Sequence, residues 1–535
     1  MRPAGRGELD SLYFDYPHFE APARAEDEPL HPVAIVGAGP VGMVAALTLA
    51  HHGVRCVLLD NKATFNDGSR AICVSRSSFH ILDHLGVARP FAEKALGWTL
   101  GRSFFRGRQI LEFAMPDSPD EKFRPMYNLQ QQYIEAFLWE AVARSPLIEA
   151  RWQSEVMALE PDGNQVSLTV ADPNGSYHLP ARWVVAADGA RSAIRRMCGL
   201  RLKGDNHEGR YVIADVQMAH DFPTIRRALF EPACRPGGTV LIHRQPDDIW
   251  RIDYQLHDDE GTDEAMREDN VRAAVAGVLH EIGHAGGWDL EWWSVYSANT
   301  LLLDDYRHGR VFFAGDSAHI VPIFGVRGLN NGIADGHNIG WKLAAVLKGE
   351  AGEALLDSYT PERRGATLDV FANATRSTRF MTPPTHGWRL MRDAALSLAL
   401  TRETAGQLAN PRQMTPYTYV DSPITSADDP GFRTGPIPGA MMPDVALDDG
   451  FLSERLGREF SLLAFGATEV PDLPGLTVVA LPATGAAAEI YGAGEGSSYL
   501  LRPDLHIAAR WRKATEARIR HALQTVLGRE METTS

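Results

Sequence analysis

The sequence predicts an α/β fold: a domain built on a parallel sheet, interrupted by a mixed or antiparallel β-sheet domain and followed by a small α/β domain. Three observations lead to this prediction. A βαβ pattern with a glycine-rich turn occupies residues 33–59. Two later apolar runs end at Asp188-Gly189 and Gly315-Asp316, and the residues between them change to period-two alternation.

Length and composition fit a reduced, multidomain globular protein. The 535 residues allow about three domains, and 44% hydrophobic with 23% charged residues is an ordinary balance. A net charge of −15 argues against a nucleic-acid or anionic-membrane partner. The four cysteines form no CxxC pair or metal-ligand spacing, so we expect no metal and a cytoplasmic location. No apolar run reaches the roughly 18–20 residues that a membrane span needs.

The pattern places the elements in order. Residues 33–36 and 54–59 read as buried strands around a helix at 43–51, and 75–87 and 130–144 have helical spacing. Period-two alternation in "GTVLIHR" and "DIWRIDYQL" predicts a hairpin, and "EAMREDNVRAAVAGVLHEIG" predicts one amphipathic helix. After the strand at 311, helices are expected from 330 and over 357–402. Three strand-like runs and a closing helix follow a Pro/Gly-rich stretch at 421–444.

These elements define five segments. We expect an N-terminal extension that packs loosely or wraps the surface, a discontinuous nucleotide-binding domain, an inserted substrate-binding sheet, a helical segment with a linker, and a C-terminal domain. Their predicted ranges are 1–31, 32–200 with 304–400, 201–303, 401–444 and 445–535.

The glycine motif predicts a dinucleotide site of the Rossmann type. Gly37 permits a tight turn, Gly39 lets backbone approach a pyrophosphate, and Gly42 lets the helix pack on the strand. Asp60 ends the next strand, where it can accept ribose hydroxyls, while the helix N-terminus offers free amides to phosphates. The motif does not separate NAD from FAD.

Two further strand ends carry carboxylates. Asp188 is followed by Ser192 and Arg195 in a DGxxSxxR pattern, which suits a ligand with hydroxyls and phosphates, although Asp188 could instead cap the next helix. Gly315-Asp316 ends the later strand, and Asp316 could reach a ribityl hydroxyl. The helix start at Leu329 and Asn330 would present backbone amides to a negatively charged ring edge.

GxGxxG, DGxxSxxR and "AGDSAH…P…N" in this order resemble the class A, single-component FAD-dependent aromatic hydroxylases with the para-hydroxybenzoate hydroxylase fold. The resemblance covers about residues 32–400. The tail is similar to the thioredoxin-like domain of the phenol hydroxylase branch. The chain departs from these patterns at Val326-Arg327, where small residues or glutamine are usual, and at Leu505, where glycine is usual.

The resemblance implies an FAD site and roles for matching residues. Asp188 and Arg195 would contact FAD and NAD(P)H. Arg70 would meet the FAD phosphates, with Arg76 as a weaker alternative, and Gln131 would meet the flavin side. The expected cofactor-binding residues are Gly37, Gly39, Gly42, Asp60, Arg70, Gln131, Asp188, Arg195, Gly315, Asp316, Leu329 and Asn330.

The implied reaction is hydroxylation of a phenolic or other aromatic substrate with NADPH or NADH and O₂, through a flavin C4a-hydroperoxide. A homodimer is also implied for chains with such a tail. The aromatic substrate could be a small catabolic phenol or a polyketide of antibiotic type, and a single-ring phenol or a hydroxybenzoate-like compound is favoured. Two other functions stay open: an FAD-dependent dehydrogenase or oxidase, and a non-catalytic flavin redox sensor.

Candidate substrate contacts come from the inserted sheet and the flavin loop. Pro322 would lie near the reacting ring, and His243 and Tyr254 are candidates for polar substrate contacts, although the pattern favours a plain sheet residue for each. The sequence does not say which face of the strand at 249–256 looks at the flavin. Arg327 could bind an anionic substrate, bind the nicotinamide phosphates, or form an ion pair facing away. His319 could hold the loop or lie near substrate.

Overall fold

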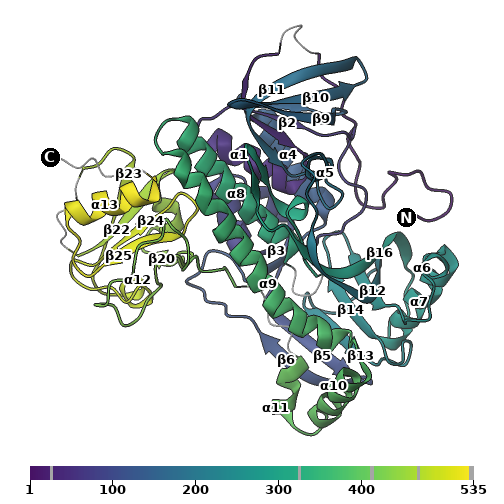
Figure 1. Ribbon diagram of the computed structural model, residues 1–535. Helices are drawn as coiled ribbons and strands as arrows, with labels where there is room; N and C mark the ends of the chain where they lie inside the picture. The colour runs from purple at the N-terminus through teal and green to yellow at the C-terminus, as the bar shows by residue number, and fades with distance from the viewer. Residues whose placement is uncertain (24–27, 323–326, 410–414, 467–469, 471, 529–535) are drawn as a thin grey trace.

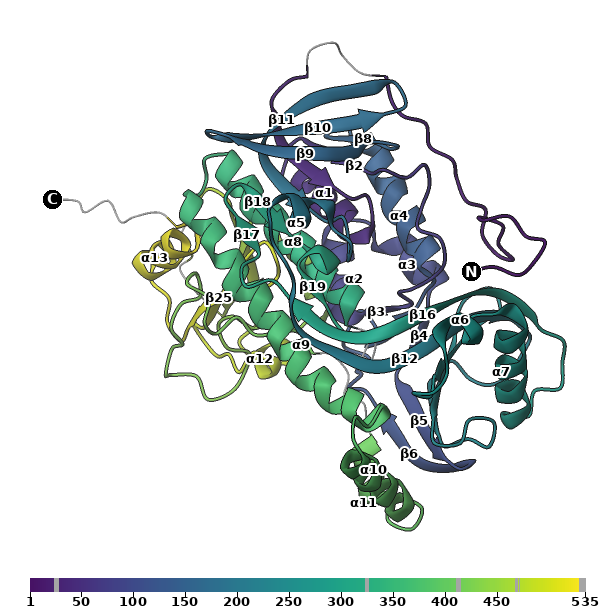
Figure 2. The same cartoon turned by 45° about the vertical axis from the view of Figure 1, so that its right-hand side comes forward.

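The computed structural model describes residues 1–23, 28–322, 327–409, 415–466, 470 and 472–528. Figure 1 shows the main parts: a largely parallel sheet with α1, α4 and α8 against it, a second large sheet that carries α6 and α7, and a C-terminal sheet beside α8 and α9. Figure 2 shows α9 running from the C-terminal sheet toward the outer end of the second sheet. The predicted α/β fold with an inserted sheet is confirmed.

The first sheet has a parallel centre in the order β8-β2-β1-β11-β18. Its strands are β1 (His31–Val36), β2 (Cys56–Leu59), β8 (Ile148–Arg151), β9 (Glu155–Asp162), β10 (Gln165–Asp172), β11 (Gly175–Ala186), β17 (Arg307–His308) and β18 (Val311–Phe313). The central runs are apolar because helices cover both faces of a parallel sheet. Three predicted motifs therefore follow neighbouring strands, since β1, β11 and β18 pair in parallel.

Helix α8 (Gly328–Leu347) packs closely on α1 (Pro40–His51) through glycines spaced four residues apart. A Cβ atom at Gly336 would lie 2.7 Å from the carbonyl oxygen of Val41, and one at Gly340 would lie 2.6 Å from Cβ of Thr48. Residues at this spacing share one helix face. These glycines, which we call the glycine stripe, thus fix the distance between α1, the helix of the first motif, and α8, the helix that follows Gly315-Asp316.

The second sheet has the order β19-β16-β12-β15-β14-β13-β5-β6. Its strands are β5 (Leu100–Phe105), β6 (Arg108–Ala114), β12 (Lys203–Gln217), β13 (Arg226–Phe230), β14 (Thr239–Arg244), β15 (Ile249–Gln255), β16 (Asp289–Leu302) and β19 (His319–Ile320). The hairpin of β14 and β15 is as predicted. The sheet nevertheless extends beyond the predicted range 201–303, because β5 adds in parallel to β13. Sequence patterns did not reveal this pairing of distant segments.

One face of the second sheet is covered by two helices rather than the single predicted one. They are α6 (Thr262–Ala265) and α7 (Glu268–Glu281), with Met266 as the C-cap of the first and Arg267 as the N-cap of the second. Val271, Val275 and Val278 pack on Trp250 and other even-numbered residues of β15. We call the opposite face, which carries the odd-numbered residues of β15, the inward face.

Smaller elements connect the two sheets. They are β3 (Cys73–Ser75), β7 (Met126–Asn128), β4 (Leu96–Trp98), α2 (Arg76–His84), α3 (Ala88–Lys94), α4 (Gln131–Arg144) and α5 (Ala193–Met197). The three short strands form their own sheet in the order β3-β7-β4. Asn128 at the end of β7 donates to the carbonyl of Arg244 at 2.8 Å, which ties this small sheet to the second sheet.

The N-terminal extension wraps the surface rather than packing loosely. Met1 accepts a hydrogen bond from the backbone N–H of Trp293 on β16 at 3.0 Å. Phe19 stacks on Trp152 with ring centroids 4.3 Å apart, and the Tyr16 hydroxyl accepts from Gln132 at 2.8 Å. The described part of the extension therefore bridges both large sheets.

The C-terminal sheet lies beside α8 and α9, whereas α10 and α11 lie next to β6 (Figure 1). The elements of the last part of the chain are η2 (Glu353–Ser358), α9 (Tyr359–Met381), α10 (His386–Ala399), α11 (Glu403–Gly406), η3 (Gln407–Ala409), β20 (Ala446–Leu447), β21 (Gly450–Phe451), η4 (Leu452–Arg455), β22 (Phe460–Phe465), β23 (Leu476–Leu481), α12 (Ala486–Ile490), β24 (Ser498–Leu501), β25 (Ile507–Trp511) and α13 (Glu516–Val526). The terminal sheet has the order β23-β22-β24-β25, with β22 and β23 parallel and the other pairs antiparallel. Its assignment as thioredoxin-like stays a prediction.

The departure at Leu505 has a backbone consequence. Leu505 has a φ of +64°, in the region that glycine adopts without strain, and its side chain is buried in the C-terminal core. The turn thus keeps the glycine-like backbone while burying a large side chain.

Within the described residues, no helix is long and apolar enough to cross a bilayer.

The glycine stripe can be tested with Gly336→Ala. The added methyl group meets backbone at 2.7 Å, so the helices must separate, and we expect about 1–3 kcal/mol of destabilisation together with weaker FAD retention. Gly387→Ala in α10 is the control, because its nearest atom would be 3.9 Å away. Thermal unfolding measures both variants. Equal melting temperatures for Gly336→Ala and the wild type would contradict the packing argument.

Candidate active site

Three strand ends meet at one edge of the first sheet. Gly37 follows β1, Asp188 follows β11 after one residue, and Gly315 follows β18 after one residue. Ligands of open parallel sheets bind outside the carboxyl ends of the strands. The structure therefore brings the three predicted motifs together.

The glycine motif forms the expected turn. Gly37 has a φ of +107°, and a Cβ there would lie 2.4 Å from the carbonyl oxygen of Ala187. A Cβ on Gly42 would lie 1.9 Å from the carbonyl oxygen of Gly37, whereas Gly39 has only Asn66 within 4 Å, at 3.9 Å. Gly39 caps α1 and leaves room for a ligand at the helix N-terminus.

Asp60 braces this turn. Its carboxylate accepts from the backbone N–H of Ala38 at 2.7 Å and from that of Lys62 at 2.9 Å. A carboxylate has further lone pairs, so ribose hydroxyls can still bind. Its predicted ribose contact stays a prediction.

Gln131 positions the segment that carries Arg70. Its side-chain oxygen accepts from the backbone N–H groups of Arg70 and Ala71, each at 3.2 Å, and its amide donates to the buried Glu135 at 2.7 Å. Glu135 also accepts from the backbone and side chain of Asn66. The Arg70 side chain is exposed, so its guanidinium is available to a phosphate.

Asp188 and Arg195 have partners in the protein. Asp188 Oδ2 accepts from the backbone N–H of Ile194 at 3.1 Å, which is the capping alternative, while its Oδ1 is buried without a partner. Arg195 donates to the carbonyls of Ser317 at 2.8 Å and Ala190 at 2.7 Å. Arg195 thus ties the loop after β11 to the turn after β18, and contact with a cofactor stays a prediction.

Asp316 combines an enclosed position with an accessible carboxylate. Burial raises the pKa of Asp316, although His319, Arg70 and Arg195 partly offset this effect. The side chain nevertheless retains accessible surface. An accessible carboxylate just beyond the end of β18 can meet a ribityl chain, and that contact stays a prediction.

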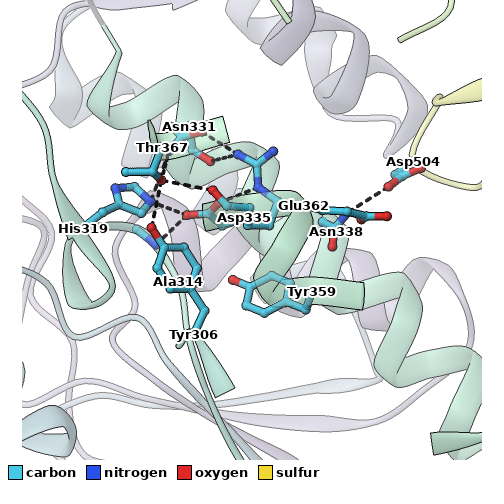
Figure 3. Close-up of polar contacts among 12 residues, drawn as sticks. Tyr306, Ala314, His319, Asn331, Asp335, Asn338, Tyr359, Glu362, Thr367 and Asp504 are labelled. Atoms are coloured by element: carbon cyan, nitrogen blue, oxygen red, sulfur yellow. Dashed lines mark hydrogen bonds and ion pairs between the residues drawn. The ribbon is translucent and has the colours of Figure 1, made fainter. Parts of the chain in front are cut away.

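A buried polar network holds Gly315-Asp316 in place (Figure 3). Asp335 Oδ2 accepts from the backbone N–H of Gly315 at 2.9 Å and lies 2.6 Å from Nε2 of His319, and Oδ1 accepts from Arg363 at 2.6 Å. Burial opposes ionisation of Asp335, but Arg363 and His319 outweigh it and hold the pKa of Asp335 below its usual value. His319 therefore holds the loop, as one of its two predicted alternatives stated.

The first turn of α8 lies where the flavin loop was predicted. Asn330 uses its side chain to accept from the backbone N–H of Ser75 and to donate to the carbonyl of Cys73, at 2.8 and 3.1 Å. The backbone N–H groups at Leu329 and Asn330 lie in the turn whose amides have no intrahelical acceptor. Pro322 is buried before this turn. Residues 323–326 of the predicted loop lie outside the described residues.

Arg327 caps α8 and is buried. Burial lowers the pKa of Arg327, and Asp369 on α9 is the acidic group that acts against this effect. This neighbour favours the predicted alternative of an ion pair facing away. A direct role of Arg327 in substrate or nicotinamide binding stays a prediction.

The inward face of the second sheet closes the site from the other side. Arg251 donates to the carbonyls of Ser69 and Arg70, and the Tyr296 hydroxyl donates to the carbonyl of Val321 at 2.6 Å. The pKa of Tyr296 is raised by burial and by Asp316. The face therefore lies over both the Arg70 segment and the Asp316 turn.

His243 lies on this inward face, but Tyr254 does not. Tyr254 packs with Val240 and Trp250 on the face that α7 covers, which favours the predicted alternative of a plain sheet residue, and its substrate contact stays a prediction. The period-two pattern gave two faces without saying which one the helices would cover. His243 is buried, and among the residues that the structure describes its Nδ1 has no partner. Burial lowers the pKa of His243 to about 3, so the ring is neutral.

Sequence reasoning missed Arg226, Asp253, Asp335 and Arg363. Asp335 and Arg363 lie in helices where charged residues usually face solvent, so only the packing of α8 on α9 reveals their role. Arg226 and Asp253 stand at inward positions of β13 and β15. Their signal was the presence of charged residues within strands that are otherwise largely apolar, and in β15 these charges stand at alternate positions.

The FAD binding domain family model matches residues 31–374. The chain belongs to the FAD binding domain family. The chain is also 30% identical over 367 residues to a 3-(3-hydroxy-phenyl)propionate/3-hydroxycinnamic acid hydroxylase of Mycolicibacterium smegmatis, and the match covers 68% of this chain but only 63% of that relative. A hydroxylase of the same name from Klebsiella pneumoniae is 27% identical over 440 residues, covering 81% of this chain and 78% of the relative.

Solved structures share the fold. The flavin-dependent monooxygenase PieE, in complex with FAD and substrate, aligns with a TM-score of 0.78 and 23% identity over 94% of this chain and 100% of its own. Aklavinone-11 hydroxylase, in a complex with FAD and aklavinone, gives a TM-score of 0.76 at 22% identity with the same coverage. At these identities the likeness concerns the fold alone.

The site residues fit FAD. The open space at Gly39, the unpartnered Oδ1 of Asp188, the exposed Arg70 and the reachable carboxylate of Asp316 are the features that a dinucleotide with hydroxyls and phosphates needs. They lie along one strand edge of the FAD-binding domain. The residues present therefore support the cofactor that the family model names.

Asp316→Ala should weaken FAD binding without destabilising the protein. Losing a hydrogen bond to a charged acceptor raises the dissociation constant of FAD by about tenfold or more. The apoprotein should melt close to wild type, because substitution of an accessible side chain usually changes stability little. Flavin fluorescence titration and thermal unfolding measure the two effects, with exposed Asp304→Ala as the control. Unchanged FAD affinity would contradict the assigned contact.

Proposed function

We propose that this protein is an FAD-dependent monooxygenase that uses NAD(P)H and O₂ to hydroxylate a phenolic substrate. One observation carries the proposal: the FAD edge of the first sheet is closed by an inward sheet face that holds buried, unpartnered polar groups. Arg226, His243 and Asp253 lie on that face. Polar groups are left unpaired in a buried site when a ligand completes them. The names of the two hydroxylase relatives support the reaction class.

The substrate class follows from Arg226. This guanidinium is 5% exposed, its Nε has no hydrogen-bond partner, and within the described residues no ion pair includes it. Burial lowers the pKa of Arg226 to about 10, so it is still charged near neutral pH. A buried cation that forms no ion pair calls for an anion. We therefore expect a phenol that also bears a carboxylate, which agrees with the hydroxybenzoate-like preference.

The chain contributes binding and shielding to the reaction. Bound FAD would carry electrons from NAD(P)H to O₂ and supply the oxygen-transfer chemistry. Asp316 and Arg70 would hold FAD, and the contact of Tyr296 with Val321 keeps the sheet closed over the site. This closure limits the entry of water, which protects reactive species in such sites.

The cellular location and the assembly of the protein belong to the same proposal. All four cysteines are free, which fits a reducing cytoplasm. A homodimer, suggested by the family resemblance, is the expected assembly, and light scattering of the purified protein measures it.

The reaction is tested by following NADH and NADPH oxidation with a panel of phenols, with and without carboxylates, under ¹⁸O₂. The expected result is NAD(P)H oxidation that depends on the phenol, with a product one oxygen heavier. Oxidation of substrate without NAD(P)H use would instead indicate a dehydrogenase or oxidase. A flavin-containing protein that turns over no compound would favour a redox sensor.

Arg226→Met should change substrate preference. Losing a charge-assisted contact raises KM for a carboxylated phenol by about 10- to 100-fold and leaves KM for the same phenol without the carboxylate unchanged. Arg227→Met is the matched control, because Arg227 points to the other face and its guanidinium lies 3.5 Å from the centroid of the Phe222 ring. Steady-state kinetics with the paired substrates measures the effect. An equal KM increase for both phenols would contradict the assignment.

A further inference from the structure

Asp253 stands in the middle of the inward face. In the cross-strand register it lies between Leu241 on β14 and Ile213 on β12. The same row continues to Ala228 on one side and Ser294 on the other. Directly opposed residues share one face of a sheet. The carboxylate thus projects from the centre of a largely apolar row.

Within the described residues, the Asp253 carboxylate forms no hydrogen bond or ion pair that explains its burial. It is 7% exposed, and its Oδ1 has no hydrogen-bond partner there. The neighbouring acid on this face, Asp215, is fully paired, because both its oxygens accept from Arg251 at 2.8 Å. A buried carboxylate without a partner is costly, so its presence calls for a ligand that it serves.

Electrostatic neighbours place Asp253 beside the flavin end of the site. Asp253 and Arg226 both act on the buried thiol of Cys73. The carbonyl of Cys73 accepts a hydrogen bond from Asn330 in the first turn of α8. Asp253 and Arg226 therefore both lie near Cys73, whose carbonyl is bonded to the turn that would meet the flavin edge.

We propose that Asp253 is the general base that accepts the phenolic proton of the substrate, an inference that rests on the proposed function. The phenol O–H bond breaks, a carboxyl O–H bond forms on Asp253, and the electron pair stays on the phenolic oxygen. This charge spreads to the ortho and para carbons, which activates them toward an electrophilic oxygen. No further oxidant or reductant takes part in the proton transfer.

The ionisation of Asp253 supports this role. Burial raises the pKa of Asp253 to about 7, with Arg251 and Arg226 lowering it and Asp215 raising it further. The other titratable groups that act here are Tyr211 on β12, His243 on β14 and Cys73 on β3. Burial keeps all three uncharged near neutral pH: Tyr211 stays a phenol, His243 a neutral imidazole and Cys73 a thiol. A base with a pKa near the working pH transfers protons efficiently.

Asp253→Asn in the holoenzyme tests the base. Single-turnover hydroxylation at pH 8 should fall by about 100-fold or more for phenols of ordinary acidity, with FAD content and flavin reduction by NAD(P)H unchanged. The loss should shrink for nitro- or polyhalogenated phenols, because these are already ionised at pH 8. The wild-type rate should rise with pH through about 7, and this step should vanish in the variant. Asp289→Asn, an exposed aspartate on β16, is the matched control.

Thermal unfolding supplies a readout independent of turnover. The pKa of Asp253 is about 7 in the folded protein and about 3.9 in the unfolded chain. Ionisation of this carboxyl therefore lowers the free energy of unfolding as pH rises from about 4 to 7. Asp253→Asn should therefore melt a few degrees higher than wild type at pH 8, and the gap should narrow toward pH 4. If Asp253 instead stabilised the fold as an ionised group, Asp253→Asn would melt lower than wild type at pH 8.

The outcomes separate this inference from the proposed function. Two results would show that Asp253 is not the base, provided that the wild type hydroxylates phenols. The first is a hydroxylation rate of Asp253→Asn within about threefold of wild type. The second is an equal loss of rate for phenols that are already ionised. A lower melting temperature in the variant at pH 8 would also overturn the inference. If the wild type hydroxylates no phenol, the proposed function fails, and the base assignment falls with it.

Discussion

The Asp335 carboxylate is the interaction on which the site geometry depends. One buried group accepts from the backbone of Gly315 and from Arg363 and contacts His319, so α8, α9 and the turn after β18 meet at a single charge (Figure 3). Removing one partner of a buried pair costs about 3–5 kcal/mol, because the other charge is left alone. This cost makes the position of Gly315-Asp316 rigid, and a rigid carboxylate can face a cofactor without rearranging.

The same network reaches the C-terminal domain. Arg363 donates to the Tyr419 hydroxyl at 2.8 Å, while the next residue toward the N-terminus, Glu362, accepts from Arg502 and Lys342, each at 2.6 Å. Asn338 on α8 bridges Glu362 and Asp504 (Figure 3). The C-terminal domain is thus attached through buried charges to the helix pair that sets the cofactor turn. Displacing it would expose or unpair these charges.

The two walls of the site differ in how they satisfy their polar groups. In the FAD-binding domain, Gln131, Asp60, Asp335 and Arg195 are paired with the backbone of the very loops that a dinucleotide would touch. On the inward face, Arg226 and Asp253 remain without such partners. A scaffold that must hold one fixed cofactor benefits from full pairing. A pocket that admits and releases a substrate must keep some groups free, and this costs stability.

The sequence by itself determined the order of the fold and the cofactor wall. Gly37, Gly39 and Gly42 require a particular turn, and apolar runs ending at Asp188 and Asp316 place these residues at one edge of a parallel sheet. Such local rules act over a few residues and can be read directly. They could not show that β5 joins the second sheet, that Tyr254 faces α7, or that Asp335 and Asp253 are buried. Those facts were decided only by the tertiary structure, because burial and pairing depend on which distant element covers a face.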